Sequence, residues 1–357
     1  MLDDFWKNKK VLITGHTGFK GGWLSFILSK FGAKVSGYSL SIPTIPSFFE
    51  VSNLDKVIDH NIGDICDYNK LKQCIERVQP DIIFHMAAQS LVRYSYNNPI
   101  ETYNTNVMGS VNLLEIVRKN SSVKATIIVT SDKCYRNEEF IYSYREHDRL
   151  GGFDPYSNSK ACTELVVDAY IQSYFINNNI GCIASVRAGN VIGGGDWAKA
   201  RLIPDVISAL SKNERPVIRS PESIRPWQHV LEPLSGYMLV AKKIFNEAKQ
   251  EKNMVWNFGP NYVNEEKVKN VVDTLCNLWQ SNVTPHIVED FTLHEAKLLT
   301  LDNTKARNEL NWVPKWDINQ ALLKTVDWYK CYYSNLGVNT NEINVIINTQ
   351  IEEYFNL

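Results

Sequence analysis

The stretch Lys10-Val-Leu-Ile-Thr-Gly-His-Thr-Gly-Phe-Lys-Gly21 decides the fold of this chain. A short apolar run leads into three glycines at the spacing G-x-x-G-x-x-G, and an amphipathic helical pattern follows over 21–31. A strand that turns through glycines into a helix lets backbone N–H groups approach a pyrophosphate at the positive end of the helix. We therefore predict a dinucleotide-binding turn. The residues of this turn expected to contact the cofactor are Gly15, Thr17, Gly18, Phe19, Lys20 and Gly21.

Outward from this turn, short apolar runs alternate with helical patterns through the first half of the chain. The expected strands are 11–14, 34–38, 57–63, 82–85, 125–130 and 182–187. The expected helices are 21–31, 67–78, 99–119 and 156–178. Strands separated by helices of this length imply βαβ units and a parallel sheet. We predict an α/β fold with a doubly wound parallel sheet of Rossmann type and a smaller C-terminal substrate domain.

The alternation of apolar runs and helical patterns ends after Gly189, where Gly193-Gly-Gly195 and several prolines interrupt it. We expect a substrate domain assembled from discontinuous pieces to begin there. The predicted dinucleotide-binding domain comprises 1–188 plus about 230–260, and the predicted nucleotide-sugar-binding domain comprises 189–229 plus about 261–357. The tail from 336 is rich in Asn and Ile, and its pattern fits either a helix or an interaction arm.

Composition excludes several classes of protein. The formal net charge is -1 and the basic residues are scattered, so neither a nucleic-acid surface nor a charged membrane surface is indicated. The N-terminal residues do not form a secretion signal, and no apolar stretch is long enough to span a membrane. The seven cysteines include no C-x-x-C pair, so we expect no metal site and reduced thiols in a cytoplasmic protein.

Two residues four positions apart, Tyr156 and Lys160, carry the first sign of chemistry. On a helix this spacing places both side chains on one face. A fixed ammonium stabilises a phenolate and moves the tyrosine pKa down from about 10 toward the working range. The pair suits proton transfer at a sugar or alcohol hydroxyl while a nicotinamide takes the hydride.

Two further expected strands end in residues that fit the same site. The strand at 82–85 runs into small residues at Ala87 and Ala88, which a flat cofactor can cover. The strand at 125–130 ends in Ser131, Asp132 and Lys133, at the carboxyl edge where open α/β sheets bind ligands.

Together these motifs resemble the extended short-chain dehydrogenase/reductases, in the branch that modifies nucleotide sugars and nearest to the CDP-glucose 4,6-dehydratases. The resemblance covers residues 10 to about 235 and thins after 260. It is carried by the segments 14–24, 130–135, 150–162, 187–197 and 225–234, in the family's order.

The resemblance implies a bound NAD. It places Asp64 at the adenine amino group and Asn106 as a support of the catalytic face, where a mid-helix Asn is otherwise a solvated position. The end of the second strand, Gly37-Tyr38-Ser39, carries neither the acid typical of NAD nor the arginine typical of NADP sites, so only the resemblance favours NAD. The remaining implied cofactor residues are Ile65, Ala87, Ala88, Thr130, Tyr156 and Lys160.

The implied reaction is a 4,6-dehydration. Tyr156 takes the proton of the sugar 4-hydroxyl, Lys160 holds the phenolate and the nicotinamide ribose, and Ser131 bonds the same 4-oxygen. Asp132, with a pKa expected to be raised by burial, acts as the acid at O6. Many nucleotide-sugar dehydratases have Glu at the next position, where this chain has Lys133; the C5 base is either Lys133 or a bound water.

The substrate diphosphate needs positive donors, for which arginine is well shaped. The expected substrate-binding residues are Ser90, Arg93, Asn190, Arg201, Arg219 and Arg225, with Trp227 and Gln228 at the nucleotide end. Arg187, at a strand end, is expected to form a structural salt bridge or to serve the site.

We expect CDP-glucose as the substrate. The alternatives are a dehydratase for a dTDP-, GDP- or UDP-hexose, a nucleotide-sugar 4-epimerase, and a catalytically silent dinucleotide-sensing regulator. The resemblance also implies a homo-oligomer, either a dimer or a tetramer, built from the helices at 99–119 and 156–178.

Overall fold

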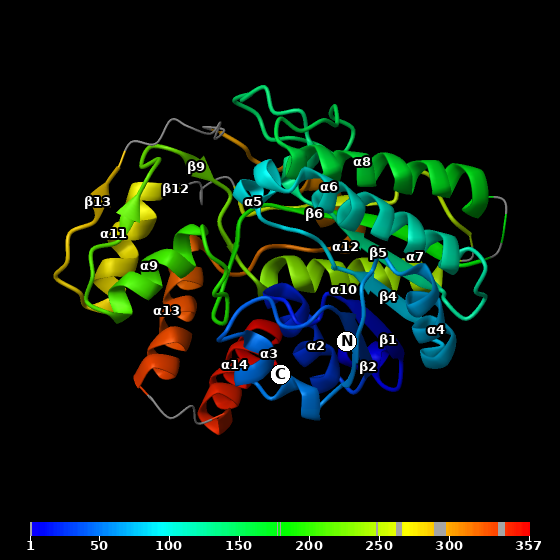
Figure 1. Cartoon of the computed structure of the whole chain (residues 1–357), viewed down its shortest axis with the longest axis horizontal. Coiled ribbons are helices and arrows are strands. Elements are labelled where there is room, and N and C mark those ends of the chain that lie inside the picture. Colours follow the sequence, from blue (N-terminus) through cyan, green and yellow to red (C-terminus); the bar gives the residue numbers. More distant parts are fainter. Residues whose placement is uncertain are drawn as a thin grey trace.

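A parallel sheet forms the centre of the molecule (Figure 1). The computed structural model describes residues 2–176, 178, 180–247, 249–261, 266–288, 298–334 and 340–357. In this part of the chain the sheet has seven strands in the order β11-β6-β5-β4-β1-β2-β3, all in parallel pairs. The strands are β1 (Lys10–Thr14), β2 (Lys34–Ser39), β3 (Asp59–Ile62), β4 (Ile82–His85), β5 (Ala125–Val129), β6 (Cys182–Ala188) and β11 (Val255–Phe258).

The strand order reverses direction at β1. The chain runs from β1 outward through β2 and β3, then returns to add β4 on the other side of β1. In a doubly wound sheet the crevice outside the carboxyl ends of the strands at this reversal is the usual ligand site. The predicted sheet is therefore confirmed, and the bounds of the predicted strands agree to within one residue except at the start of β3, which begins two residues later than predicted.

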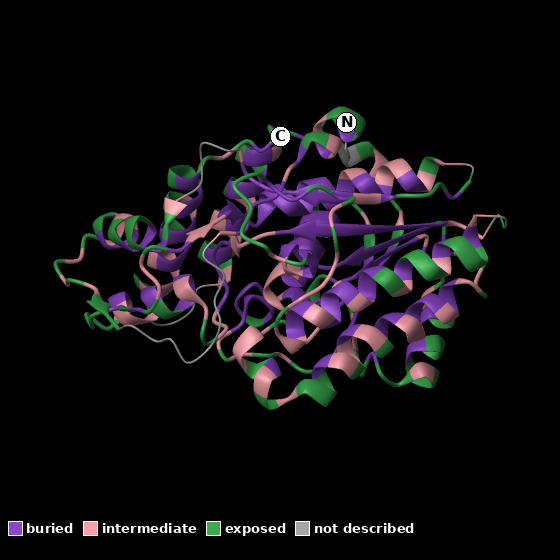
Figure 2. Cartoon of the chain, turned by 90° about the horizontal axis from the view of Figure 1, so that it is seen from above, coloured by how far each residue is buried: buried purple, intermediate pink, exposed green. Residues whose placement is uncertain are grey.

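Helices cover both faces of the sheet because side chains alternate along each strand. In β1, Val11 and Ile13 join one buried cluster, and Leu12 joins another. The first cluster includes α2 (Phe19–Lys30) and α10 (Leu231–Asn246). The second includes α4 (Tyr68–Val78), α7 (Gly109–Val117) and α8 (Pro155–Tyr170). Figure 2 shows the buried strands between helices whose outer faces are exposed.

The expected helix at 99–119 is divided in the structure. It consists of α6 (Pro99–Tyr103), the π-helical turn η2 (Asn104–Met108) and α7. The expected helix at 156–178 consists of α8, which begins at Pro155 with Asp154 as its N-cap, and the π-helical turn η4 (Ile171–Phe175). A π-turn often marks a functional position within a helix, and η2 contains Asn106.

Shorter helices connect these elements. They are α1 (Leu2–Trp6), α3 (Phe48–Val51), η1 (Leu54–Lys56), α5 (Val92–Asn97) and η3 (Asp132–Cys134).

The remaining elements gather beyond the carboxyl end of the sheet (Figure 1). Three two-stranded pairs form here: β10 (Gln228–His229) with β7 (Val191–Ile192), β12 (Glu266–Lys267) with β9 (Ile224–Arg225), and β13 (His286–Ile287) with β8 (Val217–Ile218). The accompanying helices are α9 (Leu202–Ser211), α11 (Val268–Trp279) and α13 (Ile318–Ser334). Helix α12 (Thr304–Leu310) lies instead beside β11 and α10, at the edge of the sheet.

The triple glycine at 193–195 marks a tight passage between the sheet and these elements. A Cβ built on Gly194 would lie 2.0 Å from the Trp328 ring, and one on Gly195 would lie 2.6 Å from Phe48. The Trp23 indole donates a hydrogen bond to the Gly194 carbonyl at 2.9 Å. Aromatic side chains therefore pack against the backbone here, and larger residues would separate them.

The C-terminal tail forms α14 (Thr340–Phe355), which packs on the dinucleotide-binding side of the molecule. Ile343, Ile347 and Ile351 are buried in the cluster that contains α2. Lys30 on α2 bonds both Asn348 and Glu352. Of the two alternatives left open by the sequence, the structure shows a packed helix.

The described residues contain no helix that is both long and apolar enough to cross a bilayer. All seven cysteines are free.

Candidate active site

A cavity of about 2180 Å³ opens at the carboxyl ends of the central strands, where the sheet meets α9 and the short strand pairs. Its wall includes residues from the turns after β1, β4, β5 and β6. The site residues predicted from the sequence line this cavity, with the exception of Asn106 and Gln228. The folded chain thus brings together side chains that are separated by more than a hundred positions in the sequence.

The glycine turn after β1 leaves no room for side chains at two positions. Gly15 has φ +78, and a Cβ there would lie 2.7 Å from the Ala87 nitrogen. A Cβ on Gly21 would lie 2.2 Å from the Gly15 oxygen. Gly18 is the N-cap of α2 and provides no side-chain cap for the helix. The first N–H groups of α2 therefore face a bare turn at the positive end of the helix, as a pyrophosphate requires.

Below the turn, His16 fills a space that the second strand leaves open. It is fully buried, and a Cβ on Gly37 would lie 2.2 Å from its ring. Its Nε2 lies 2.6 Å from Nδ1 of His60. Burial lowers the pKa of His16 to about 3, so this imidazole is neutral at physiological pH. The structure therefore gives His16 a packing role beneath the turn, which the sequence did not reveal.

Lys20 occupies the first turn of α2 at the cavity wall. Its Nζ donates to the Tyr237 hydroxyl at 3.2 Å, and the ammonium lies over the same ring. Burial, with the like charges of Lys160 and Arg201, lowers the pKa of Lys20 to about 7. Tyr237 comes from the interior of α10, and no sequence motif singles it out.

Further cofactor-side residues line the cavity at the ends of β2 and β3. Thr17 is buried and its Oγ1 lies 2.8 Å from the Ser39 hydroxyl, at the end of β2. Asp64 is exposed after β3, and its Oδ1 accepts a hydrogen bond from the Cys66 nitrogen at 2.8 Å. Ile65 is buried beside it.

Ser131 and Asp132 form the polar end of β5. The Ser131 hydroxyl caps η3, accepting from the Lys133 nitrogen at 3.2 Å and donating to Asp132 Oδ1 at 2.9 Å. Asp132 is 2% exposed, and its Oδ2 is buried without a hydrogen-bond partner. A buried, unpaired carboxyl oxygen at a cavity wall is a candidate site for a ligand.

Tyr156 and Lys160 lie on α8 and are both buried. Lys160 Nζ donates to the Val129 carbonyl at 3.1 Å, which ties the lysine to the end of β5. Burial raises the pKa of Tyr156 to about 12, and a hydrogen bond with Ser131 partly opposes this rise. The predicted downward shift of the tyrosine pKa is therefore wrong for the protein alone, because removing the phenol from water outweighs the nearby charges.

Asn106 lies behind the cavity wall. Its Oδ1 accepts from the Gln89 nitrogen at 2.8 Å, and its Nδ2 donates to the Gln89 carbonyl at 3.0 Å and to the Ser159 hydroxyl at 2.8 Å. It is 1% exposed. These bonds join the segment after β4 to α8, so this asparagine holds α8 in place, and its predicted role among the cofactor residues stays a prediction.

On the substrate side, Arg201 links two parts of the cavity. Its guanidinium bonds Asp196 Oδ2 and the Ser90 hydroxyl, each at 2.9 Å. Asp196 belongs to a quoted family motif, but the sequence did not assign it a role. The other predicted substrate residues that line the same cavity are Arg93, Asn190, Arg219, Arg225 and Trp227. Gln228 is instead buried and donates to the Phe258 carbonyl at 2.8 Å.

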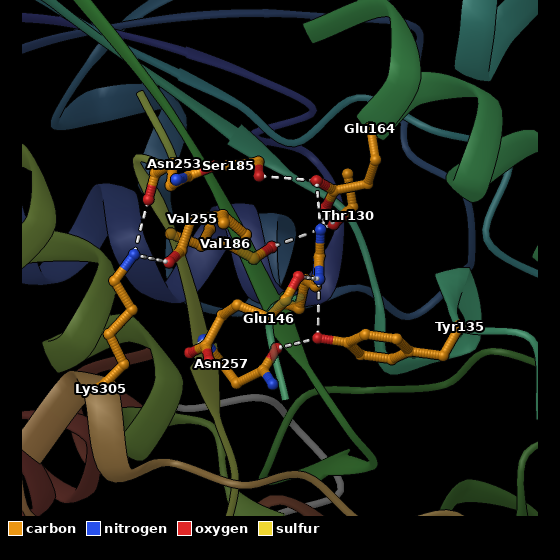
Figure 3. Close-up of polar contacts among 11 residues, drawn as sticks. Thr130, Tyr135, Glu146, Glu164, Ser185, Val186, Asn253, Val255, Asn257 and Lys305 are labelled. Carbon is orange, nitrogen blue, oxygen red and sulfur yellow. Dashed lines mark hydrogen bonds and ion pairs between the residues drawn. The ribbon is translucent and has the colours of Figure 1, made fainter. Parts of the chain in front are cut away.

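Arg187 does not line the cavity wall. It is buried and forms an ion pair with Glu164 at 2.9 Å. Of the two roles left open by the sequence, the geometry supports the salt bridge, within the network of polar contacts in Figure 3. The described residues contain no group of three or more His, Cys, Asp or Glu side chains that could hold a metal ion.

The sequence model of the family described as GDP-mannose 4,6 dehydratase matches residues 12–325. The chain belongs to this family. Membership of the GDP-mannose 4,6 dehydratase family confirms the resemblance to nucleotide-sugar dehydratases. A CDP-glucose 4,6-dehydratase of Salmonella typhimurium is 49% identical over 338 residues, covering 93% of this chain and 94% of the relative. A dTDP-glucose 4,6-dehydratase of Haemophilus influenzae is 27% identical over 348 residues, covering 89% and 97%.

Solved structures support the fold of this family member. A UDP-glucose 4-epimerase of Thermotoga maritima superposes with a TM-score of 0.79 at 23% identity, covering 90% of this chain and 98% of that one. A dTDP-glucose 4,6-dehydratase of Bacillus anthracis in complex with NAD gives a TM-score of 0.76 at 24% identity, covering 93% and 99%. Epimerases and dehydratases share this architecture, so the reaction must be argued from the site.

Proposed function

We propose that this protein is an NAD-dependent nucleotide-sugar 4,6-dehydratase and that its substrate is CDP-glucose. The observation that carries the reaction type is Asp132, a buried carboxyl with an unpaired oxygen that lines the same cavity as Tyr156. The choice of CDP-glucose rests on the 49% identity to a CDP-glucose 4,6-dehydratase along nearly the whole chain, against 27% for a dTDP-glucose enzyme.

The residues of the glycine turn fit a dinucleotide. The positions where a Cβ would collide with backbone are occupied by glycine, and α2 starts at the same turn. Lys160 uses one of its three N–H donors on the Val129 carbonyl, which leaves donors for a ribose hydroxyl. A bound NAD would supply the hydride acceptor for C4 of the sugar and the hydride donor for C6.

In the first half of the reaction, Tyr156 takes the proton from the 4-hydroxyl, and Ser131 donates a hydrogen bond to the same oxygen. The raised pKa of Tyr156 means that the phenolate must be stabilised before it can accept this proton. Lys160 supplies that charge, as its ammonium lies on the same face of α8. The C4 carbonyl that results acidifies the proton on C5.

In the second half, elimination removes the C5 proton and the 6-hydroxyl together as water. Asp132 donates a proton to the departing O6 from its unpaired oxygen. Lys133, on the cavity wall beside it, or a water removes the C5 proton. With hydride at C6 and a proton returned to C5, the product is a CDP-4-keto-6-deoxyhexose, and the oxidised cofactor is restored.

An epimerase, which needs only oxidation and re-reduction at C4, has no use for an acid at O6. Turnover of purified protein with CDP-glucose tests the proposal. We expect a product lighter than the substrate by one water, with the alkaline absorbance of a 4-keto sugar. A product of unchanged mass would identify an epimerase, and preferential turnover of dTDP-, UDP- or GDP-hexose would refute the choice of CDP-glucose. The absence of turnover with all four would favour the silent regulator.

We also infer that the protein forms a homodimer through α6 to α8, which lie side by side on one surface (Figure 1). Large apolar side chains on these helices are exposed, including Ile100 at 77% and Leu165 at 59%. Light scattering should give about twice the chain mass of 40.9 kDa. Leu165→Glu should reduce it to the monomer mass, and an unchanged mass would place the interface elsewhere.

For the domain organisation, we propose the division predicted from the sequence with α14 assigned to the dinucleotide-binding domain, against which its isoleucines pack. The seven free cysteines support a reducing compartment, and we propose the cytoplasm.

A further inference from the structure

Behind the catalytic wall, the carboxylate of Glu164 is fully enclosed by donors (Figure 3). Arg187 donates to it through Nε and Nη2, each at 2.9 Å, in a bidentate pair. Ser185 donates from β6 at 2.7 Å, and Thr130 donates from the end of β5. Thr130 immediately precedes Ser131 and Asp132. Glu164 therefore ties α8 to the strand that presents the proposed acid.

The Arg187 guanidinium also contacts the chain on the C-terminal side of Asp132. Arg187 Nη1 donates to the Tyr135 hydroxyl at 2.7 Å and to the Glu146 carbonyl at 3.1 Å, and its charge lies 4.9 Å from the centre of the Tyr135 ring. Tyr135 in turn donates to Asn257 at 2.8 Å. Because Tyr135 follows η3 directly, Arg187 contacts the chain on both sides of the Ser131–Cys134 segment, once through Glu164 and Thr130 and once directly.

The proposed proton-transfer pair is held by the same element. Tyr156, Lys160 and Glu164 recur every four residues and are all buried along α8. We propose that Arg187 and Glu164 are positioning residues that set the placement of the Tyr156–Lys160 pair relative to Ser131 and Asp132. This inference rests on the proposed function, because it concerns the geometry of that reaction.

A buried ion pair between two elements contributes little net stability. Removing two charges from water costs several kcal/mol, and apolar residues of similar volume often stabilise a core equally well. An apolar pair, however, does not fix the relative orientation of the elements that it joins. A planar guanidinium that binds one carboxylate with two parallel bonds and a phenol with a third permits one arrangement of the three segments.

Glu164 also acts on Lys160 through its charge. Burial lowers the pKa of Lys160 to about 8, and Glu164, one turn away, opposes this effect. The other groups that face Lys160 are the Cys134 thiol from η3, the Val129 carbonyl from β5, Lys20 from α2 and His85 from β4. Lys20 is the cation among these groups, and its charge disfavours the protonated form of Lys160. Glu164 is therefore the fixed negative charge that favours the protonated lysine.

The test compares Glu164→Gln, Arg187→Met and the double variant, all as holoenzymes. Hydride transfer is followed by NADH absorbance in single turnovers, elimination by the 4-keto product, and folding by thermal unfolding. Glu247→Gln is the control, since it breaks the Lys243–Glu247 pair near the end of α10, away from the cavity and from α6 to α8. The control should keep wild-type kcat, KM and pH profile.

We expect each single variant to unfold at lower temperature, since one buried charge is left unpaired. The double variant should regain most of the stability but stay about a hundred-fold below wild type in kcat, with KM changed only a few-fold, because misplacement by about 1 Å has this effect on a reacting geometry. In Glu164→Gln, the loss of activity on the alkaline side should begin at lower pH than in wild type.

Two results would overturn the inference. One is a double variant in which kcat recovers together with stability, since a purely structural pair would behave in this way. The other is an alkaline limb of Glu164→Gln that coincides with that of the wild type. If the wild-type protein itself does not dehydrate CDP-glucose or another nucleotide hexose, the proposed function fails and the inference fails with it. Turnover by the wild-type protein distinguishes the two failures. Without it the proposed function fails, and with it only the positioning role of Arg187 and Glu164 is in question.

Discussion

The glycine turn permits a prediction in which two neighbouring glycines respond differently to the same substitution. In Gly21→Ala the new methyl group would lie 2.2 Å from the Gly15 oxygen, where ordinary contacts begin near 3.4 Å, so the backbone must move by more than an ångström. In Gly18→Ala the nearest atom is the same oxygen at 3.4 Å, which is an ordinary contact. The folded protein thus tolerates alanine at 18 but not at 21.

The expected magnitudes follow from these distances. Overpacking of this kind costs about 1–3 kcal/mol, and each kcal/mol lowers the melting temperature of a large domain by about 2–4 °C. Gly21→Ala should therefore melt several degrees below wild type. Gly18→Ala should melt with the wild type yet bind NAD more weakly, because its methyl group adds bulk where the pyrophosphate approaches the backbone.

The assay combines thermal unfolding of the protein without added nucleotide with NAD titration by quenching of tryptophan fluorescence. The reasoning would be refuted if Gly18→Ala lost as much thermal stability as Gly21→Ala. It would also be refuted if Gly18→Ala bound NAD with wild-type affinity, since the second glycine would then have no part in cofactor binding.

Three further predictions concern titratable groups. Asp132→Asn should abolish water loss while leaving the first reduction of NAD largely intact, as seen by comparing single-turnover NADH absorbance with 4-keto product; an equal loss of both would remove Asp132 from its role as the acid. Because Lys160 has a pKa lowered to about 8, kcat should fall as pH rises through that value and the ammonium is lost, and a rate constant that stays level well above it would contradict the role of the charge. Burial raises the pKa of Glu232 from 4.5 to about 7, so the folded state holds this proton more tightly; its contribution to stability is complete below about pH 4.5 and is lost as pH rises through 7. In the wild type, this proton should make the free energy of unfolding decline by about 3 kcal/mol between about pH 4.5 and 7. Glu232→Gln should remove that decline, measured by urea unfolding, and an unaltered dependence of the unfolding free energy on pH would contradict the assignment.

Much of the cofactor half of the site could be predicted because its signals are local in sequence. The turn at 10–21 contains strand, glycines and helix start within a few residues, and each of these is specified by side chains next to it. The Tyr156 and Lys160 pair is likewise set by one helix. The alternation of apolar runs then predicts a parallel sheet, which brings the ends of β1, β4 and β5 to one edge.

Other features depended on contacts between distant segments. The direction of the Tyr156 pKa shift was predicted wrongly because the shift comes from burial, which depends on elements such as α5 and η3 that pack against α8 and which no local pattern measures. Arg187 and Glu164 are 23 positions apart and carry no motif that pairs them. Tyr237 reaches the cavity from a helix whose sequence shows only that it is buried.

The sequence alone determined the sheet, the glycine turn and the helix that carries Tyr156 and Lys160, since each follows from periodicity or from residues adjacent in the chain, while the reaction was implied by the resemblance to a known family. The tertiary structure alone decided which charges are paired, which carboxyl oxygen of Asp132 stays free, and where the C-terminal helix packs. Those properties depend on desolvation and on distances between segments, and both come into being only when the chain has folded and water has been excluded.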